Sequence, residues 1–154
     1  MTLYKHFPSK QALIVAVLER KCGSFLAGMR EQLSRRGGPP RERLLAVFDV
    51  LAEWFAQPDF HGCLFVKAAG EFPDAADPIH QAAADYKRQF LQLMVEQAQA
   101  AGAPSPRLLA QRLFLLVAGA TVLAQVLGGA EAARQARDTA ALILRQMLPD
   151  PAQA

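Results

Sequence analysis

The sequence predicts an all-α protein, and three observations support this fold class. Every segment with a readable hydrophobic period repeats at three or four residues, which is the spacing of one helix face. No segment alternates apolar and polar residues as a half-buried strand does. Most prolines and glycines fall between the periodic segments, where they end one helix and begin another. We therefore expect a helical bundle.

The first predicted helix extends from Ser9 to Ser34. Pro8 disfavours helical geometry in the residue before it, and the hydroxyl of Ser9 can cap the first turn. One face of this helix is apolar and is formed by Ile14, Leu18, Cys22, Phe25, Met29 and Leu33. The following segment, RRGGPP, ends the helix, because glycine suits a helix C-terminus and proline suits the first turn of the next helix.

Three helices are predicted in the middle of the chain. The first ends before Pro58, and its apolar face is formed by Leu44, Val47, Phe48, Leu51 and Phe55. The second is short, covers Cys63 to Glu71, and is closed by Pro73. The third begins after Asp77, which can serve as its N-cap, and ends near Gly102. Its apolar face is formed by Ile79, Ala83, Tyr86, Phe90 and Leu93.

The last two predicted helices are expected to pack closely against other helices. The helix from Ser105 to Leu127 is apolar almost all round, which predicts burial on more than one side. A second helix runs from about Ala130 to Leu148, after a break at two glycines. Small and apolar residues spaced three and four apart suit a helix–helix seam. The candidate dimer-interface residues are Ala120, Ala124, Gly128, Ala133, Ala136, Ala140, Ile143 and Met147.

Length and composition fit one globular domain. The chain has 154 residues, of which 52% are hydrophobic and 20% are charged, a balance that argues against disorder. The net charge of +3 is only weak evidence for a nucleic-acid partner, although basic residues are concentrated near the N-terminus. Residues 113–130 approach the length of a membrane span, but they contain three glycines. We therefore predict a buried helix, no membrane association and, since no signal peptide is recognisable, a cytoplasmic protein.

Two segments resemble parts of TetR-family transcriptional regulators. The stretch TLYKHFPSK, followed by an apolar helix, resembles the boundary between the DNA-reading helix and the long linking helix of that family. The stretch HGCLFVKAAGEFPD resembles a segment of its ligand-binding domain. The resemblance implies that residues 1–8 are a remnant of a helix-turn-helix domain and that residues 9–150 form the effector-binding and dimerisation domain. Because most of the helix-turn-helix is absent, this chain alone should not bind DNA specifically.

Four residues near the N-terminus are candidates for DNA binding: Thr2, Tyr4, His6 and Lys10. Read without the resemblance, they form a charged and aromatic helix end on the surface. The resemblance implies instead that they contact the DNA backbone, since hydroxyl, imidazole and ammonium donors can fix a protein on phosphates without reading bases.

A second set of candidates is aromatic and apolar and lies on the middle helices and the helix after them. Each residue alone fits an ordinary core. As a group they suit a cavity for a small apolar or amphipathic effector, which the resemblance also implies. Trp54, Tyr86 and Thr121 could orient such a ligand through their polar atoms. The candidates are Phe48, Trp54, Phe55, Cys63, Val66, Tyr86, Phe90, Met94, Phe114 and Thr121.

Cys63 allows a further alternative, a thiol that senses electrophiles or oxidants. Reactivity requires nearby positive charge and some exposure, and His61 and Lys67 are close in sequence. A buried, unreactive cysteine is the commoner situation. His61 and His80 do not form a recognised metal-binding spacing with Cys63 or Asp77, so no metal or other cofactor is predicted.

The sequence therefore predicts a ligand-responsive transcriptional regulator, by default a repressor, and not an enzyme. It contains no phosphate-binding glycine loop, no nucleophile elbow and no acidic pair with an obvious partner. The predicted partners are a second copy in a homodimer, a small effector and, in the full-length form, operator DNA. The alternative is a stand-alone helical dimer that binds a ligand or acts as a scaffold without binding DNA.

Overall fold

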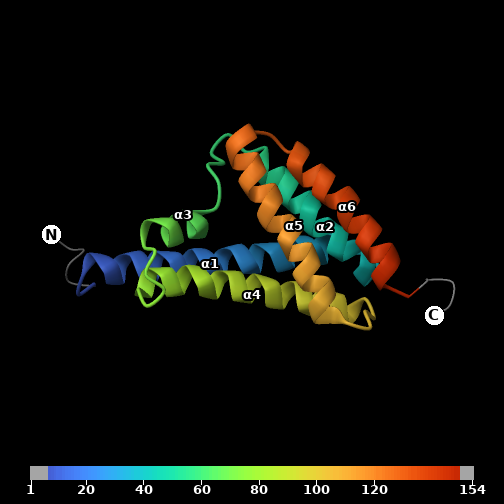
Figure 1. Ribbon diagram of the computed structural model, residues 1–154, viewed down its shortest axis with the longest axis horizontal. Helices are drawn as coiled ribbons and strands as arrows, with labels where there is room; N and C mark the ends of the chain where they lie inside the picture. The colour runs from blue at the N-terminus through green and yellow to red at the C-terminus, as the bar shows by residue number, and fades with distance from the viewer. Residues whose placement is uncertain (1–6, 150–154) are drawn as a thin grey trace. The chain divides into compact units, whose positions relative to one another are not determined.

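The computed structural model describes residues 7–149 and confirms the all-α fold class (Figure 1). Within this range the structure contains six helices and no strand. Their bounds lie close to those predicted from hydrophobic period, glycine and proline. The helices are α1 (Lys10–Arg36), α2 (Pro40–Phe55), α3 (Leu64–Glu71), α4 (Pro78–Ala100), α5 (Pro106–Leu127) and α6 (Glu131–Met147).

The chain divides into two compact units, each with its own contacts. The first unit comprises residues up to Gly28 together with Cys63–Phe90, and the second comprises Met29–Gly62 together with the residues from Leu91 onwards. Helices α1 and α4 therefore begin in the first unit and end in the second. Each unit is described below by itself.

The first unit is built from the start of α1, helix α3 and the start of α4. Both long helices have the side-chain caps that the sequence predicts: Ser9 Oγ accepts a hydrogen bond from the backbone N–H of Ala12 at 3.1 Å, and Asp77 Oδ1 accepts one from Ile79 at 2.7 Å. Asp77 also links the two helix starts, since the Gln11 amide donates to its Oδ2 at 3.3 Å. These bonds fix where α1 and α4 begin relative to each other.

The second unit is a three-helix packing of α2, α5 and α6, joined by the ends of α1 and α4 (Figure 1). Its core holds fully buried side chains from all three helices, among them Val47, Leu113 and Leu144. Burial of such apolar surface is the main favourable term in folding. An ion pair between Arg137 Nε and Asp49 Oδ1 at 2.8 Å also joins α6 to α2.

Helix α5 differs from its prediction, because it is buried on one side only within the chain. Its buried positions include Leu109, Leu113 and Val117, whereas Leu115 and Val126 are each 72% exposed and Leu127 is 78% exposed. The sequence is apolar on every face, but α2 and α6 cover only one face. By length and composition α5 could cross a membrane, a criterion that core helices of soluble proteins also satisfy.

The candidate dimer-interface residues divide into two groups. Ala133 and Ala140 have no exposed surface, and Ala120, Ala124 and Ala136 are buried as well, so these five alanines pack within their own chain. Gly128 is exposed, and Ile143 and Met147 are partly exposed. For these three residues the predicted role in a dimer stays a prediction.

Candidate functional site

An aromatic cluster surrounds Tyr86 in the first unit. The Tyr86 ring stacks on Phe65 of α3, with ring centroids 3.7 Å apart and ring planes within 9° of parallel. Phe25 of α1 meets Tyr86 and Phe90 edge-on, at centroid distances of 5.5 and 5.4 Å. The two edge-to-face contacts have a favoured aromatic geometry, whereas the Tyr86 and Phe65 rings lie nearly face to face. Three helices thus contribute to one cluster, called here the Tyr86 cluster: Phe25, Phe65, Tyr86 and Phe90.

The surroundings of Tyr86 keep its phenol protonated. Burial raises the pKa of Tyr86 far above its ordinary value, and the nearby thiols of Cys63 and Cys22 raise it further. Burial also raises the pKa of the Cys22 thiol, with a smaller contribution from the Asp85 carboxylate. A neutral phenol in an apolar setting can donate one directed hydrogen bond to a ligand.

Cys63 lies at the N-cap position of α3 and is 4% exposed. Its side chain makes no capping hydrogen bond. This burial favours the interpretation of Cys63 as an unreactive cysteine, because a reactive thiol needs access to its oxidant or electrophile. His80 was also considered as a metal ligand. Its Nδ1 forms a hydrogen bond with the backbone carbonyl oxygen of Phe72, at 2.8 Å. Within residues 7–149 no three potential ligands are grouped to hold a metal ion.

A second aromatic cluster lies where α2 ends, in the second unit. The rings of Trp54 and Phe60 meet edge-on with centroids 4.9 Å apart, and Phe55 lies 4.9 Å from Phe60. The adjoining Gly62 has φ of +89°, a conformation that favours glycine, and the side chain of Gln125 lies where a Cβ would be. These contacts hold the α2–α3 loop against α5.

The predicted effector-binding residues fall in both units. Cys63, Val66, Tyr86 and Phe90 belong to the first unit, and the others belong to the second. Val66 is 42% exposed, and it is the one candidate on the open face of α3. Phe48 and Met94 have no exposed surface, as core residues do. The Thr121 hydroxyl donates to the carbonyl oxygen of Val117 at 2.7 Å, so only its lone pairs remain for a ligand.

Of the DNA-binding candidates, the structure places only Lys10. This residue is exposed and opens α1 directly after the Ser9 cap. Thr2, Tyr4 and His6 lie outside the described residues. Their proposed contacts with phosphates stay predictions.

Sequence reasoning missed an exposed apolar surface on the last two helices. We call it the α5–α6 face, and it consists of Leu115, Val122, Leu123, Val126 and Leu127 of α5 and Leu142 of α6. Leu115, Val122 and Val126 follow one another at spacings of seven and four residues, and Leu123 and Leu127 are adjacent to the last two, so the α5 positions lie along one broad side of the helix. The periodicity was present in the sequence, but a helix that is apolar all round does not indicate which side its own chain covers.

Residues 40–140 match the family described as "Tetracyclin repressor-like, C-terminal domain". The match covers most of the chain, which therefore belongs to the TetR family of transcriptional regulators. This finding confirms the family resemblance; the segment HGCLFVKAAGEFPD lies within the matched range, whereas TLYKHFPSK lies before it.

Two curated relatives come from Escherichia coli. The chain is 25% identical over 117 residues to the HTH-type transcriptional regulator YjdC, covering 76% of this chain and 61% of YjdC. It is 33% identical over 82 residues to the HTH-type transcriptional repressor NemR, covering 53% of this chain and 41% of NemR. The chain thus spans about three fifths of the first relative and less of the second. Both names denote transcriptional regulators and not enzymes, in agreement with the prediction for this chain.

Solved structures of TetR-family proteins share the fold over nearly the whole chain. The reduced form of Escherichia coli NemR superposes with a TM-score of 0.83 at 26% identity, covering 98% of this chain and 80% of NemR. A TetR-family transcriptional regulator from Streptomyces coelicolor gives a TM-score of 0.82 at 26% identity, covering 95% and 77%.

Proposed function

We propose that residues 9–150 form the effector-binding and dimerisation domain of a ligand-responsive transcriptional regulator. The observation that carries this proposal is the family match over residues 40–140, together with a fold shared with solved TetR-family regulators. NemR is named a repressor, so repression is the default sign for this protein. In the whole protein, a helix-turn-helix domain would bind operator DNA, with Lys10 against the phosphates, and the regulator would act in the cytoplasm.

The proposed effector is a small apolar or amphipathic molecule that carries a hydrogen-bond acceptor. The rings of the Tyr86 cluster pack on one another, so a ligand would bind there by parting them, and Tyr86 would then offer its neutral phenol as a donor. A ligand acceptor at this phenol would be oriented by one hydrogen bond. The effector could change DNA affinity only if it bound two conformations of the protein unequally.

The proposed homodimer forms through the α5–α6 face. Six large apolar side chains remain exposed there in a single chain, and large exposed apolar patches mark association surfaces. A two-fold axis would place the same face of each copy against the other. Gly128, Ile143 and Met147, which the sequence also predicts at the interface, are not buried within the chain and could take part, whereas the five alanines are buried.

The function is tested by combining a ligand search with DNA binding. Small apolar compounds with a carbonyl acceptor are screened for a rise in the melting temperature of this chain. Tyr86→Phe, which keeps the ring and removes the donor, should weaken the binding of a true effector about tenfold, or ~1.4 kcal/mol.

The whole protein, encoded with any in-frame codons that precede this chain, is then titrated onto tiled promoter DNA. Release of one fragment by the effector supports regulation. Binding of the ligand by a protein that binds none of the DNA fragments would favour the stand-alone ligand-binding dimer.

A further inference from the structure

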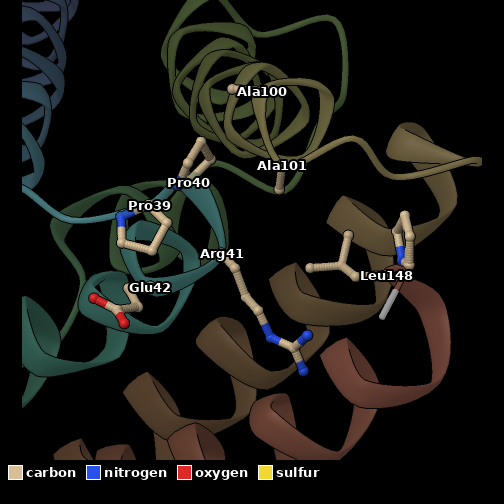
Figure 2. Close-up of a pocket in the computed structure, with 8 residues that line it drawn as sticks. Pro39, Pro40, Arg41, Glu42, Ala100, Ala101 and Leu148 are labelled. Atoms are coloured by element: carbon tan, nitrogen blue, oxygen red, sulfur yellow. The ribbon is translucent and has the colours of Figure 1, made fainter. Parts of the chain in front are cut away.

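A groove of about 500 Å³ lies in the second unit, apart from both aromatic clusters (Figure 2). Three segments form its walls: Pro39 and Pro40 at the start of α2, Ala100 and Ala101 at the end of α4, and Leu148 and Pro149 after α6. These side chains are apolar, and the volume falls in the range of small-molecule sites. None of the residues proposed for the effector lines this groove.

One positive charge reaches into this apolar groove. Figure 2 shows the Arg41 side chain extending from α2 toward the side on which Leu148 lies. Among residues 7–149, Arg41 has no ion-pair partner. Glu42 also borders the groove, but its carboxylate lies beside Gly38, on the other side of α2 from the Arg41 guanidinium. The guanidinium is therefore available to pair with a negatively charged group of a ligand in the groove.

Two buried polar atoms next to the groove also lack partners among the described residues. They are Nε of Arg43, a donor, and Oε1 of Gln97, an acceptor. Arg43 follows Pro40 by three residues, and Gln97 precedes Ala100 by three, so each lies one helical turn from a groove wall on the same helix face. Buried polar groups normally have a hydrogen-bond partner in the protein, in ordered water or in a ligand.

We propose that this groove binds a small amphipathic carboxylate. The carboxylate pairs with the Arg41 guanidinium, whose planar donors match its two oxygens. The hydrocarbon part lies against the prolines and Leu148. Arg43 Nε and Gln97 Oε1 are enclosed and do not line the groove, so they would act on the ligand only through an ordered water. This site is separate from the proposed effector site and does not depend on it.

The test is an NMR titration of the ¹⁵N-labelled chain with sodium octanoate and with octanamide, its uncharged analogue. Octanoate should shift the amides of Arg41, Ala101, Gly102 and Leu148 in a saturable way. Octanamide should bind at least tenfold more weakly, because it cannot pair with Arg41 as an ion. Equal binding of the two compounds overturns the proposal, and this comparison needs no variant to fold.

Variants locate the binding in the groove. Arg41→Gln should weaken octanoate at least tenfold, whereas Arg20→Gln, which removes an exposed arginine of the first unit, should leave the affinity unchanged. Ala101→Phe should fill the groove and abolish the shifts. Shifts that survive Ala101→Phe, or that centre on Tyr86, overturn the proposal. A chain that binds octanoate only after the substitution Asp150→Asn would also overturn the proposal. In that case Arg41 would pair with a carboxylate of its own chain and not with a ligand.

Discussion

Tyr86 is enclosed by rings from α1, α3 and α4, and this enclosure determines which protonation state it keeps. Burial removes the hydration that would stabilise the phenolate, and this raises the pKa of Tyr86. The nearby thiols of Cys63 and Cys22 raise this pKa further. Since the folded-state pKa is above the ordinary value of 10.0, the folded chain holds a proton that the unfolded chain releases at high pH. The resulting stability is fully present below about pH 10 and decreases as the pH rises above it.

Replacing Tyr86 by phenylalanine tests this linkage. Urea unfolding of the wild-type chain should show the free energy of unfolding decreasing above about pH 10, by at most ~1.4 kcal/mol per pH unit from this residue. Tyr86→Phe should decrease less steeply over the same range, because phenylalanine has no proton to release. The same comparison in a Cys22→Ala background removes the titration of the Cys22 thiol, which interacts with Tyr86. Parallel pH profiles would show that Tyr86 titrates normally in the fold.

At the scale of helices, the caps identified in the sequence are present in the structure. Ser9 caps α1 and Asp77 caps α4, and the first residue of each helix follows directly. Such signals are local, since a side-chain oxygen needs only the backbone amides two or three residues later. The starts of α1 and α4 could therefore be predicted from their caps, and the bounds of the other helices, which have no side-chain cap, from proline, glycine and hydrophobic period.

Removing the α4 cap should destabilise the first unit. Asp77→Ala loses the bond to Ile79 and the contact with Gln11, and we expect a loss of about 1–2 kcal/mol in the free energy of unfolding. Asp77→Asn keeps an acceptor oxygen at the cap and should lose much less. Chemical denaturation of the three proteins measures both values. A loss in Asp77→Asn as large as that in Asp77→Ala would mean that charge, and not the cap bond, stabilises this end of α4.

The faces of the helices were harder to predict than their ends. For α3, whose residues are mostly apolar, the pattern did not show that Val66 points to solvent while Phe65 stacks on Tyr86. For α5, every side is apolar, so period alone could not separate the side against α2 and α6 from the exposed side. The aromatic candidates were chosen by residue type, and their division between two units depends on contacts far apart in sequence.

At the scale of the whole molecule, α5 and α6 carry the apolar surface that a single chain leaves uncovered. Leu115, Val126 and Leu127 are the most exposed side chains of this face. Exposing such side chains to water is unfavourable, and association of two copies would remove them from it. The α5–α6 face, the Tyr86 cluster and the carboxylate groove have no residue in common, so the three proposed binding functions can be separated by substitution.

Placing a charge on the α5–α6 face should prevent dimerisation. We expect the wild-type chain to sediment as a dimer in analytical ultracentrifugation and Val126→Glu to sediment as a monomer, because the carboxylate would be desolvated at the interface without a partner. Val17→Glu is the control: it changes a valine on α1 that is also exposed, 45% against 72% for Val126, and should leave the dimer intact because it lies in the first unit. Far-UV circular dichroism should show unchanged helix content in both variants, since neither residue is part of the buried core. A dimer that persists in Val126→Glu and dissociates in Val17→Glu would move the interface from α5 and α6 to α1.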